Sequence, residues 1–120
     1  MSELISIDDF KKVEIKIGEI KSAEKIEGSE KLLKLIVNFG AATGEASPDN
    51  KEVRQVLSGI AAHFPDPSTL VGKRCPFVTN LAPRMMMGLE SQAMILATGG
   101  DDEAPFALFE TIGAPGARVR

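Results

Sequence analysis

Apolar and polar residues alternate along several short stretches of the chain, with the two-residue period of a half-buried β-strand. Between Val13 and Ile17 every second residue is apolar. The alternation shifts phase after Gly18 and continues to Ala23, which predicts a β-bulge or a glycine kink in a strongly curved strand. Such curvature favours a barrel.

Further elements follow the same reasoning. Strands are predicted at 32–39, 52–58, 73–79 and 92–98, short helical turns at 7–12, 59–64 and 67–72, and one more strand at 106–112. Pro76 requires an edge position or a bulge in its strand, because proline lacks an amide hydrogen. Loops are predicted at 40–51 and 80–91, and an acidic hinge at 99–105.

This order of elements predicts the fold class. Five short strands, with a helical connection between the third and the fourth, indicate an all-β, five-stranded Greek-key barrel of the OB type, whereas a sandwich would need about seven strands. The chain has 120 residues, of which 43% are hydrophobic. We therefore predict a single domain over 1–120, with 1–12 and 99–120 as extra terminal segments outside the barrel.

Charge and composition exclude several classes of protein. Lys and Arg number 14 and Asp and Glu 17, so the net charge of −3 excludes a polycation that coats nucleic acid or membranes by bulk charge. Trp and Tyr are absent, which argues against broad single-strand binding by base stacking. The single cysteine, Cys75, excludes an intramolecular disulfide and suits the cytoplasm. No signal peptide or membrane-spanning stretch is recognisable.

Motifs for catalysis are missing. The sequence contains no phosphate-loop lysine motif, dinucleotide-binding glycine pattern, paired-histidine zinc helix or nucleophile elbow. His63 is the only histidine, and we interpret it as a surface or capping residue; Cys75 we interpret as a buried packing residue. We expect no catalytic residue, no metal and no cofactor.

Two groups of residues permit both a purely structural and a functional interpretation. Three consecutive methionines at 85–87 could form an adaptable contact surface or fill gaps in the core. The cationic side chains of Lys31, Lys34, Arg54 and Arg84 could bind an anion or simply be solvated on strand faces.

A family resemblance favours the functional interpretation of these two groups. Residues 9–20 (DFKKVEIKIGEI), 30–35 (EKLLKL), 56–61 (VLSGIA), 70–73 (LVGK), 80–88 (NLAPRMMMG) and 90–97 (ESQAMILA) resemble, in order, the tRNA-binding domain appended to bacterial methionyl-tRNA synthetases. Free-standing structure-specific tRNA-binding proteins and a secretion chaperone-like protein share the pattern. The resemblance covers nearly the whole chain except 40–51, and it implies an OB fold.

The resemblance also implies a ligand and a site. It implies a non-catalytic module that binds tRNA by shape and backbone as a homodimer, free-standing or as the C-terminal domain of the synthetase. The matching positions of the binding groove are Lys31, Lys34, Arg54, Ser58, Asn80, Arg84, Met87, Ser91 and Gln92. Cations would contact phosphates, and the polar groups phosphate or ribose oxygens. The segments 1–12 and 99–120 are the candidates for the dimer interface.

Some positions depart from the family pattern. Ala82 stands where many members have lysine, Ala93 where glycine is common, and the 40–51 loop is longer than usual. The first departure removes an expected phosphate contact. A chaperone-like, peptide-binding dimer therefore stays open as an alternative, with the methionines 85–87 and Phe64 or Phe77 forming an apolar groove.

Overall fold

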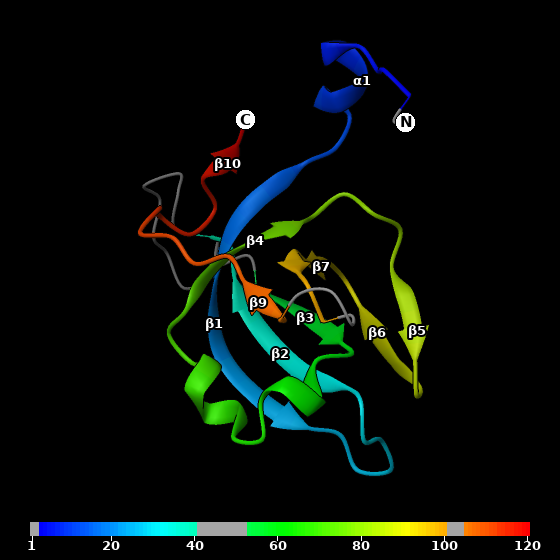
Figure 1. Cartoon of the computed structure of the whole chain (residues 1–120), viewed down its shortest axis with the longest axis vertical. Coiled ribbons are helices and arrows are strands. Elements are labelled where there is room, and N and C mark those ends of the chain that lie inside the picture. Colours follow the sequence, from blue (N-terminus) through cyan, green and yellow to red (C-terminus); the bar gives the residue numbers. More distant parts are fainter. Residues whose placement is uncertain (1–2, 41–52, 101–104) are drawn as a thin grey trace.

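A computed structural model describes residues 3–40, 53–100 and 105–120. The chain forms a strongly curled antiparallel sheet that wraps into an OB-like barrel, so the predicted all-β fold class is confirmed (Figure 1). Of the loop predicted at 40–51, residues 41–51 lie outside the described residues. Residues 101–104 of the predicted acidic hinge lie outside them too. No described helix is long and apolar enough to cross a membrane.

The main sheet has the strand order β3-β2-β1-β4-β7, with β10 paired to β1. Its strands are β1 (Ile15–Lys25), β2 (Leu33–Asn38), β3 (Val53–Ser58), β4 (Arg74–Val78), β7 (Met94–Ile95) and β10 (Arg118–Val119). Two small antiparallel sheets pair β5 (Arg84–Met86) with β6 (Leu89–Ser91), and β8 (Ala97–Thr98) with β9 (Ala107–Leu108). The helical elements are α1 (Ile7–Lys11), η2 (Ala61–His63) and η3 (Pro67–Leu70).

The core lies inside the curled sheet and follows the predicted alternation. Leu33, Leu35 and Val37 of β2 are fully buried, and they belong to one cluster with Phe77 of β4. Leu70 of η3 joins the same cluster and closes one end of the barrel. The helical turns predicted between the third and fourth strands are thus confirmed, and they complete the hydrophobic core.

The curvature of β1 has two sources. The pairing register between β1 and β2 shifts between Ile20 and Ser22, so the predicted bulge exists, a few residues beyond Gly18. Gly18 itself permits close packing, because a Cβ there would lie 2.4 Å from Val37 Cγ1 and 2.6 Å from Phe39 Cε1. The predicted phase shift therefore corresponds to two features of β1: a bulge between Ile20 and Ser22, and the close packing of Gly18 against Val37 and Phe39.

The expectation that Pro76 requires an edge position or a bulge needs a correction, because its strand is internal and its pairing with β1 has no register shift. β4 lies between β1 and β7, but β7 pairs only with Phe77 and Val78. The amide of Thr79 donates to Glu14 O, just before β1, and backbone amides alternate in direction along a strand. The nitrogen of Pro76 consequently faces away from β1, toward the side of β7. Because β7 pairs only with Phe77 and Val78, no strand residue of β7 lies opposite Pro76. Proline is therefore tolerated at this position although β4 is an internal strand.

The second half of the chain differs most from the prediction. The strand predicted at 92–98 is divided into β7 and β8, and the loop predicted at 80–91 contains the hairpin β5–β6. Only β9 forms within 106–112, and β10 was not predicted. The predicted N-terminal turn is confirmed as α1, capped by the Ser6 side chain; it stands off the barrel and buries none of its residues (Figure 1).

Candidate functional site

The β5–β6 hairpin carries two exposed methionines beside the barrel wall. Its two-residue turn, Met87–Gly88, has positive φ angles of 53° and 77°, as a type I′ turn requires. Pairing of Met86 with Leu89 sets the register, and the side chains of Met85 and Met87 remain 67% and 58% exposed. The methionine run thus lies mostly on the surface at the hairpin tip rather than in the core, with its middle member half-buried.

The base of the hairpin is fastened to the edge of β3. The Ser91 hydroxyl accepts from Leu57 N at 3.0 Å and donates to Ala93 O at 3.1 Å, and it is buried. Gln92 N donates to Gln55 O at 2.8 Å, while Gln92 Oε1 accepts from Gln55 N at 3.0 Å. These bonds close the barrel between β3 and the segment before β7. Ser91 and Gln92 therefore hold the hairpin in place.

A small hollow of about 80 Å³ opens between the hairpin and β3. Its lining is apolar apart from a cation and a hydroxyl: Leu57, Leu81, Ala82, Arg84, Met86, Ser91, Ala93 and Met94. Arg84 is exposed at the start of β5, where it pairs with Ser91. A hollow of this size accommodates one sugar or a base edge rather than a whole small-molecule ligand.

The turn between β1 and β2 lies beside the hairpin tip. A Cβ on Gly28 would be 3.7 Å from Met87 Cε, so the two loops touch. Lys31 is exposed to solvent at the end of this turn, whereas Lys34, on β2, forms an ion pair with Glu24 at 2.7 Å. The structure thus places the turn that ends at Lys31 beside Met87, and it provides Lys34 with an acidic partner.

Arg54 and Asn80 bond backbone groups of other elements. Arg54 Nη1 donates to Thr79 O at 2.6 Å, and its guanidinium lies 5.6 Å from the centre of the Phe39 ring. The side chain of Asn80 bonds the backbone of Glu14 and Lys12, which ties the N-terminal segment to the end of β4. Both side chains join elements of the fold, a role that sequence reasoning did not assign to them.

Ser58 and Cys75, two further residues considered in the sequence, are half-buried and buried, respectively. Ser58 is half-buried at the end of β3, opposite Leu33. Cys75 is completely buried, and this burial, with a further contribution from Glu110, raises the pKa of its thiol to about 11. Within residues 3–40, 53–100 and 105–120, no three His, Cys, Asp or Glu side chains come close enough to hold a metal ion.

Comparisons with known proteins match this architecture. A family model described as "Putative tRNA binding domain" matches residues 15–117. A methionine–tRNA ligase of Methanococcus aeolicus is 45% identical over 102 residues, covering 85% of this chain and 14% of that protein. The chain therefore spans about a seventh of the length of this relative.

Solved structures give the same result. The structure of a MetRS-related protein from Pyrococcus horikoshii superimposes with a TM-score of 0.83 at 37% identity, covering 99% of this chain and all of that one. The chaperone CsaA of Bacillus anthracis superimposes with a TM-score of 0.77 at 18% identity, covering 98% of this chain and all of that one. At this low identity, the second likeness shows only that the two proteins share a fold.

Proposed function

The chain belongs to the tRNA-binding domain family, and from this premise we propose that it is a non-catalytic module that binds tRNA by shape and phosphate contacts. In OB-like barrels, the loops that join the first two and the last two barrel strands commonly bind oligonucleotides. Here these loops are the turn before β2 and the β5–β6 hairpin, which meet at Gly28 and Met87. That meeting of the two loops is the observation that carries the proposal.

The chemistry of this edge supports recognition of a nucleic-acid backbone. Lys31 and Arg84 supply exposed cations for phosphates, and the apolar hollow offers a place for a ribose. No described aromatic residue lines the hollow, so base stacking is not needed for the interaction. The edge is therefore suited to phosphate and sugar rather than to bases.

The other implied site residues act indirectly in this proposal. Ser91 and Gln92 position the hairpin, and Arg54 and Asn80 fix the barrel end, through the bonds described above. Lys34 lies opposite Leu57, on the face that carries the hollow, and extends the edge along β2, whereas Ser58 lies opposite the buried Leu33, on the other face of the sheet. With few phosphate contacts per copy, we infer modest, salt-dependent affinity, strengthened in a homodimer. We place the module in the cytoplasm, alone or as part of a methionyl-tRNA synthetase.

A titration of mixed tRNA against double-stranded DNA tests the proposal. We expect tRNA to bind more tightly, with an affinity that falls steeply between about 50 and about 200 mM salt. Arg84→Glu and Lys31→Glu should each weaken binding, while Lys73→Gln, which removes a cation paired with Glu110 on another surface, should not. Equal affinity of wild type and both charge reversals would refute this site.

A peptide-binding chaperone is the second candidate. The observation in its favour is that several apolar side chains in and next to the hairpin are exposed to solvent: Leu81, Met85, Met87 and Met94. Phe77 cannot contribute to such a groove, because it is fully buried in the core, and Phe64 packs against Phe106 instead. Suppression of client aggregation that persists at high salt would favour this candidate over tRNA binding.

A further inference from the structure

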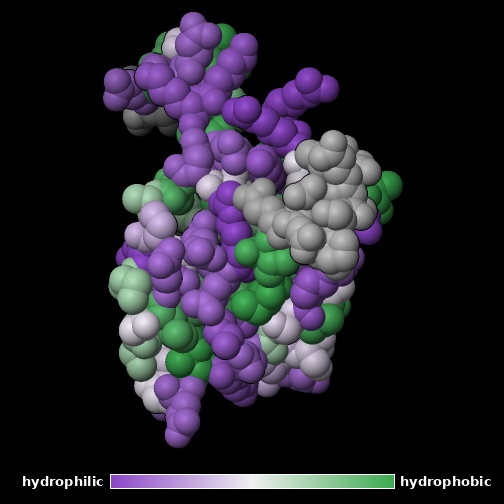
Figure 2. Space-filling model, turned by 180° about the vertical axis from the view of Figure 1, so that it is seen from behind, coloured by the Kyte–Doolittle hydropathy of each residue, from purple (hydrophilic) through white to green (hydrophobic). Residues whose placement is uncertain are grey.

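Two thioethers at the tip of the β5–β6 hairpin are open to oxidation. The side chains of Met85 and Met87 are 67% and 58% exposed, and the sulfur of a methionine takes up one oxygen atom from a peroxide to form a sulfoxide. Seen from behind, hydrophobic residues reach the surface along the left edge, on the side where the hairpin lies (Figure 2). The sequence contains no Trp or Tyr and a single Cys, so its sulfur chemistry rests largely on methionine.

The cysteine does not compete for a mild oxidant. Cys75 is fully buried, and this burial raises the pKa of its thiol to about 11, so little of the reactive thiolate exists at neutral pH. Among the described methionines, Met94 is 46% exposed and Met86 is half-buried. We therefore expect a peroxide to reach Met85 and Met87 first.

The two exposed methionines differ in what they contact. Arg84 and Met86 line the hollow beside β3, and successive side chains of a strand point to opposite faces, so Met85 projects from the outer face of the hairpin. Met87 lies in the turn, at a φ of 53°, and a Cβ on Gly28 would lie 3.7 Å from its Cε. Oxidation of Met87 consequently changes the contact between two loops, whereas oxidation of Met85 changes only an outer surface.

A sulfoxide does not suit the contact that Met87 makes. Its oxygen is a hydrogen-bond acceptor, but Gly28 meets the Met87 methyl group with its Cα side, and the neighbouring hollow is apolar apart from Arg84 and Ser91. An acceptor without a donor must keep water around it, so water enters between the turn before β2 and the hairpin. The two loops then separate more easily.

We propose that Met87 is a reversible oxidation site, through which a peroxide lowers the affinity of this module for tRNA. The inference rests on the proposed function, because the loops that meet at Met87 form the proposed tRNA site. The thioether sulfur attacks one peroxide oxygen, the O–O bond breaks and hydroxide leaves, which takes the proton of the sulfur-bound hydroxyl and becomes water. The sulfur loses two electrons and the peroxide gains them. A thiol-dependent sulfoxide reductase reverses the change.

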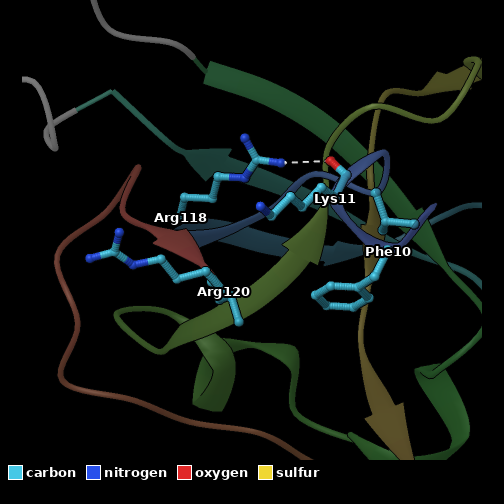
Figure 3. A pocket seen from close by; sticks show the side chains of 6 residues that line it. Phe10, Lys11, Arg118 and Arg120 are labelled. Carbon is cyan, nitrogen blue, oxygen red and sulfur yellow. Dashed lines mark hydrogen bonds between the residues drawn. The ribbon is translucent and has the colours of Figure 1, made fainter. Parts of the chain in front are cut away.

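Dimerisation leaves this site accessible. Figure 3 shows the side chains of Phe10 and Lys11 beside those of Arg118 and Arg120, in the two terminal segments where we expect a second copy to bind. The hairpin belongs to neither segment, and it lies away from α1 and β10 (Figure 1). A homodimer formed through the terminal segments therefore exposes Met87 in both copies.

Binding of mixed tRNA before and after mild treatment with hydrogen peroxide tests the site, while tandem mass spectrometry locates each added oxygen. We expect the wild type to lose affinity by about three- to tenfold as Met87 gains its oxygen, and a sulfoxide reductase to restore the affinity. Met87→Leu should lose no affinity relative to its own untreated form. Met85→Leu, the matched control from the same methionine run, should respond to peroxide as the wild type does.

Glutamine imitates the polarity of a sulfoxide without any oxidation. Met87→Gln should bind tRNA about as weakly as the oxidised wild type and should not respond to peroxide, and Met85→Gln should bind more tightly than Met87→Gln. If Met87 is oxidised in the wild type without a change in affinity, or if peroxide weakens Met87→Leu as much as the wild type, the inference is overturned and the tRNA site stands. If the untreated wild type does not bind tRNA, the proposed function fails and the inference fails with it.

Discussion

At the scale of single residues, Gly18 shows how tightly the barrel closes on itself. An alanine Cβ at this position would lie 2.4 Å from Val37 and 2.6 Å from Phe39, which are both buried. We expect Gly18→Ala to lower the free energy of unfolding by about 2 kcal/mol or more, because the core must shift to accept it. Urea unfolding followed by circular dichroism measures the loss.

Gly59 provides the matched control for this substitution. A Cβ added there would meet open space within 4 Å, and the residue has no positive φ, so Gly59→Ala should change stability by less than about 0.5 kcal/mol. If Gly18→Ala unfolds at the same urea concentration as Gly59→Ala, the close approach of β1 to β2 is not as tight as described.

The buried thiol of Cys75 makes the stability of the protein depend on pH. Its thiol pKa is raised from 9.0 to about 11, first by burial and then by Glu110. The native state thus holds the thiol proton more tightly than the unfolded chain, so this stabilisation is complete below pH 9 and is lost as the pH rises toward 11. We expect the wild type to lose more stability than Cys75→Ala between about pH 8 and about pH 10.5.

The comparison with Cys75→Ala cancels the titration of lysines and of the remaining groups. A thiol reagent gives a second test, since the native thiol should react only as fast as the barrel opens, whereas the urea-unfolded chain should react at once. Rapid labelling of the native protein would contradict the burial of Cys75.

At the scale of elements, the seam between β3 and the base of the hairpin is held by the buried Ser91 hydroxyl together with the Gln55–Gln92 bonds. Ser91 satisfies Leu57 N and Ala93 O in a buried position. Ser91→Ala leaves both groups without this partner, and we expect a loss of about 1–3 kcal/mol. The Leu57 amide should also exchange its hydrogen faster, because the hairpin base separates more often from β3.

The control for this prediction is Ser58→Ala. Ser58 ends the same strand, is half-buried, and has no described side-chain hydrogen bond, so its loss should be within about 0.5 kcal/mol. Unchanged exchange at Leu57 in Ser91→Ala would show that backbone pairing alone holds the seam.

The elements also show what a single sequence can predict. The alternation in β2 identified its buried face correctly, because one side of that strand packs against the core over its whole length. The β5–β6 hairpin was missed, because Met87–Gly88 lacks the Asn-Gly or Asp-Gly signal of a type I′ turn and the methionine run has no alternation. β10 is two residues long and is defined only by its distant partner Ile15–Lys16 on β1.

The candidate site was predictable only in part for a related reason. Sequence motifs selected Lys31, Arg84 and Met87, and the structure places Arg84 at the hollow and Met87 beside the turn that precedes Lys31. Their part in binding stays a prediction. Arg54 and Asn80 stand among the same candidates, yet their side chains bond backbone groups far away in the sequence. Whether a polar side chain faces solvent or bridges two elements depends on tertiary contacts that no local pattern contains.

At the scale of the whole molecule, a large apolar surface remains uncovered. A groove of about 360 Å³ is almost entirely apolar and is lined by Ile15, Ile17, Pro76, Leu96, Phe109, Glu110, Thr111 and Val119. At the same end of the barrel, α1 buries none of its residues, and such a short helix is not stable by its propensity alone. A second copy of the chain is the partner that we expect to cover these surfaces.

Light scattering after size exclusion tests this expectation. Leu4 and Ile112 are 94% and 98% exposed, so Leu4→Asp/Ile112→Asp should leave the fold of one copy intact while it places charge on the two terminal segments that flank the groove and α1. We expect wild type at twice the chain mass, the double variant at the mass of one chain, and Leu81→Asp, an equally polar change on the hairpin side, still dimeric. Because one copy offers half the phosphate contacts, the double variant should also bind tRNA with a shallower salt dependence. A wild-type protein that stays monomeric at micromolar concentration would contradict the dimer. The terminal segments would then pack only against the barrel of their own chain.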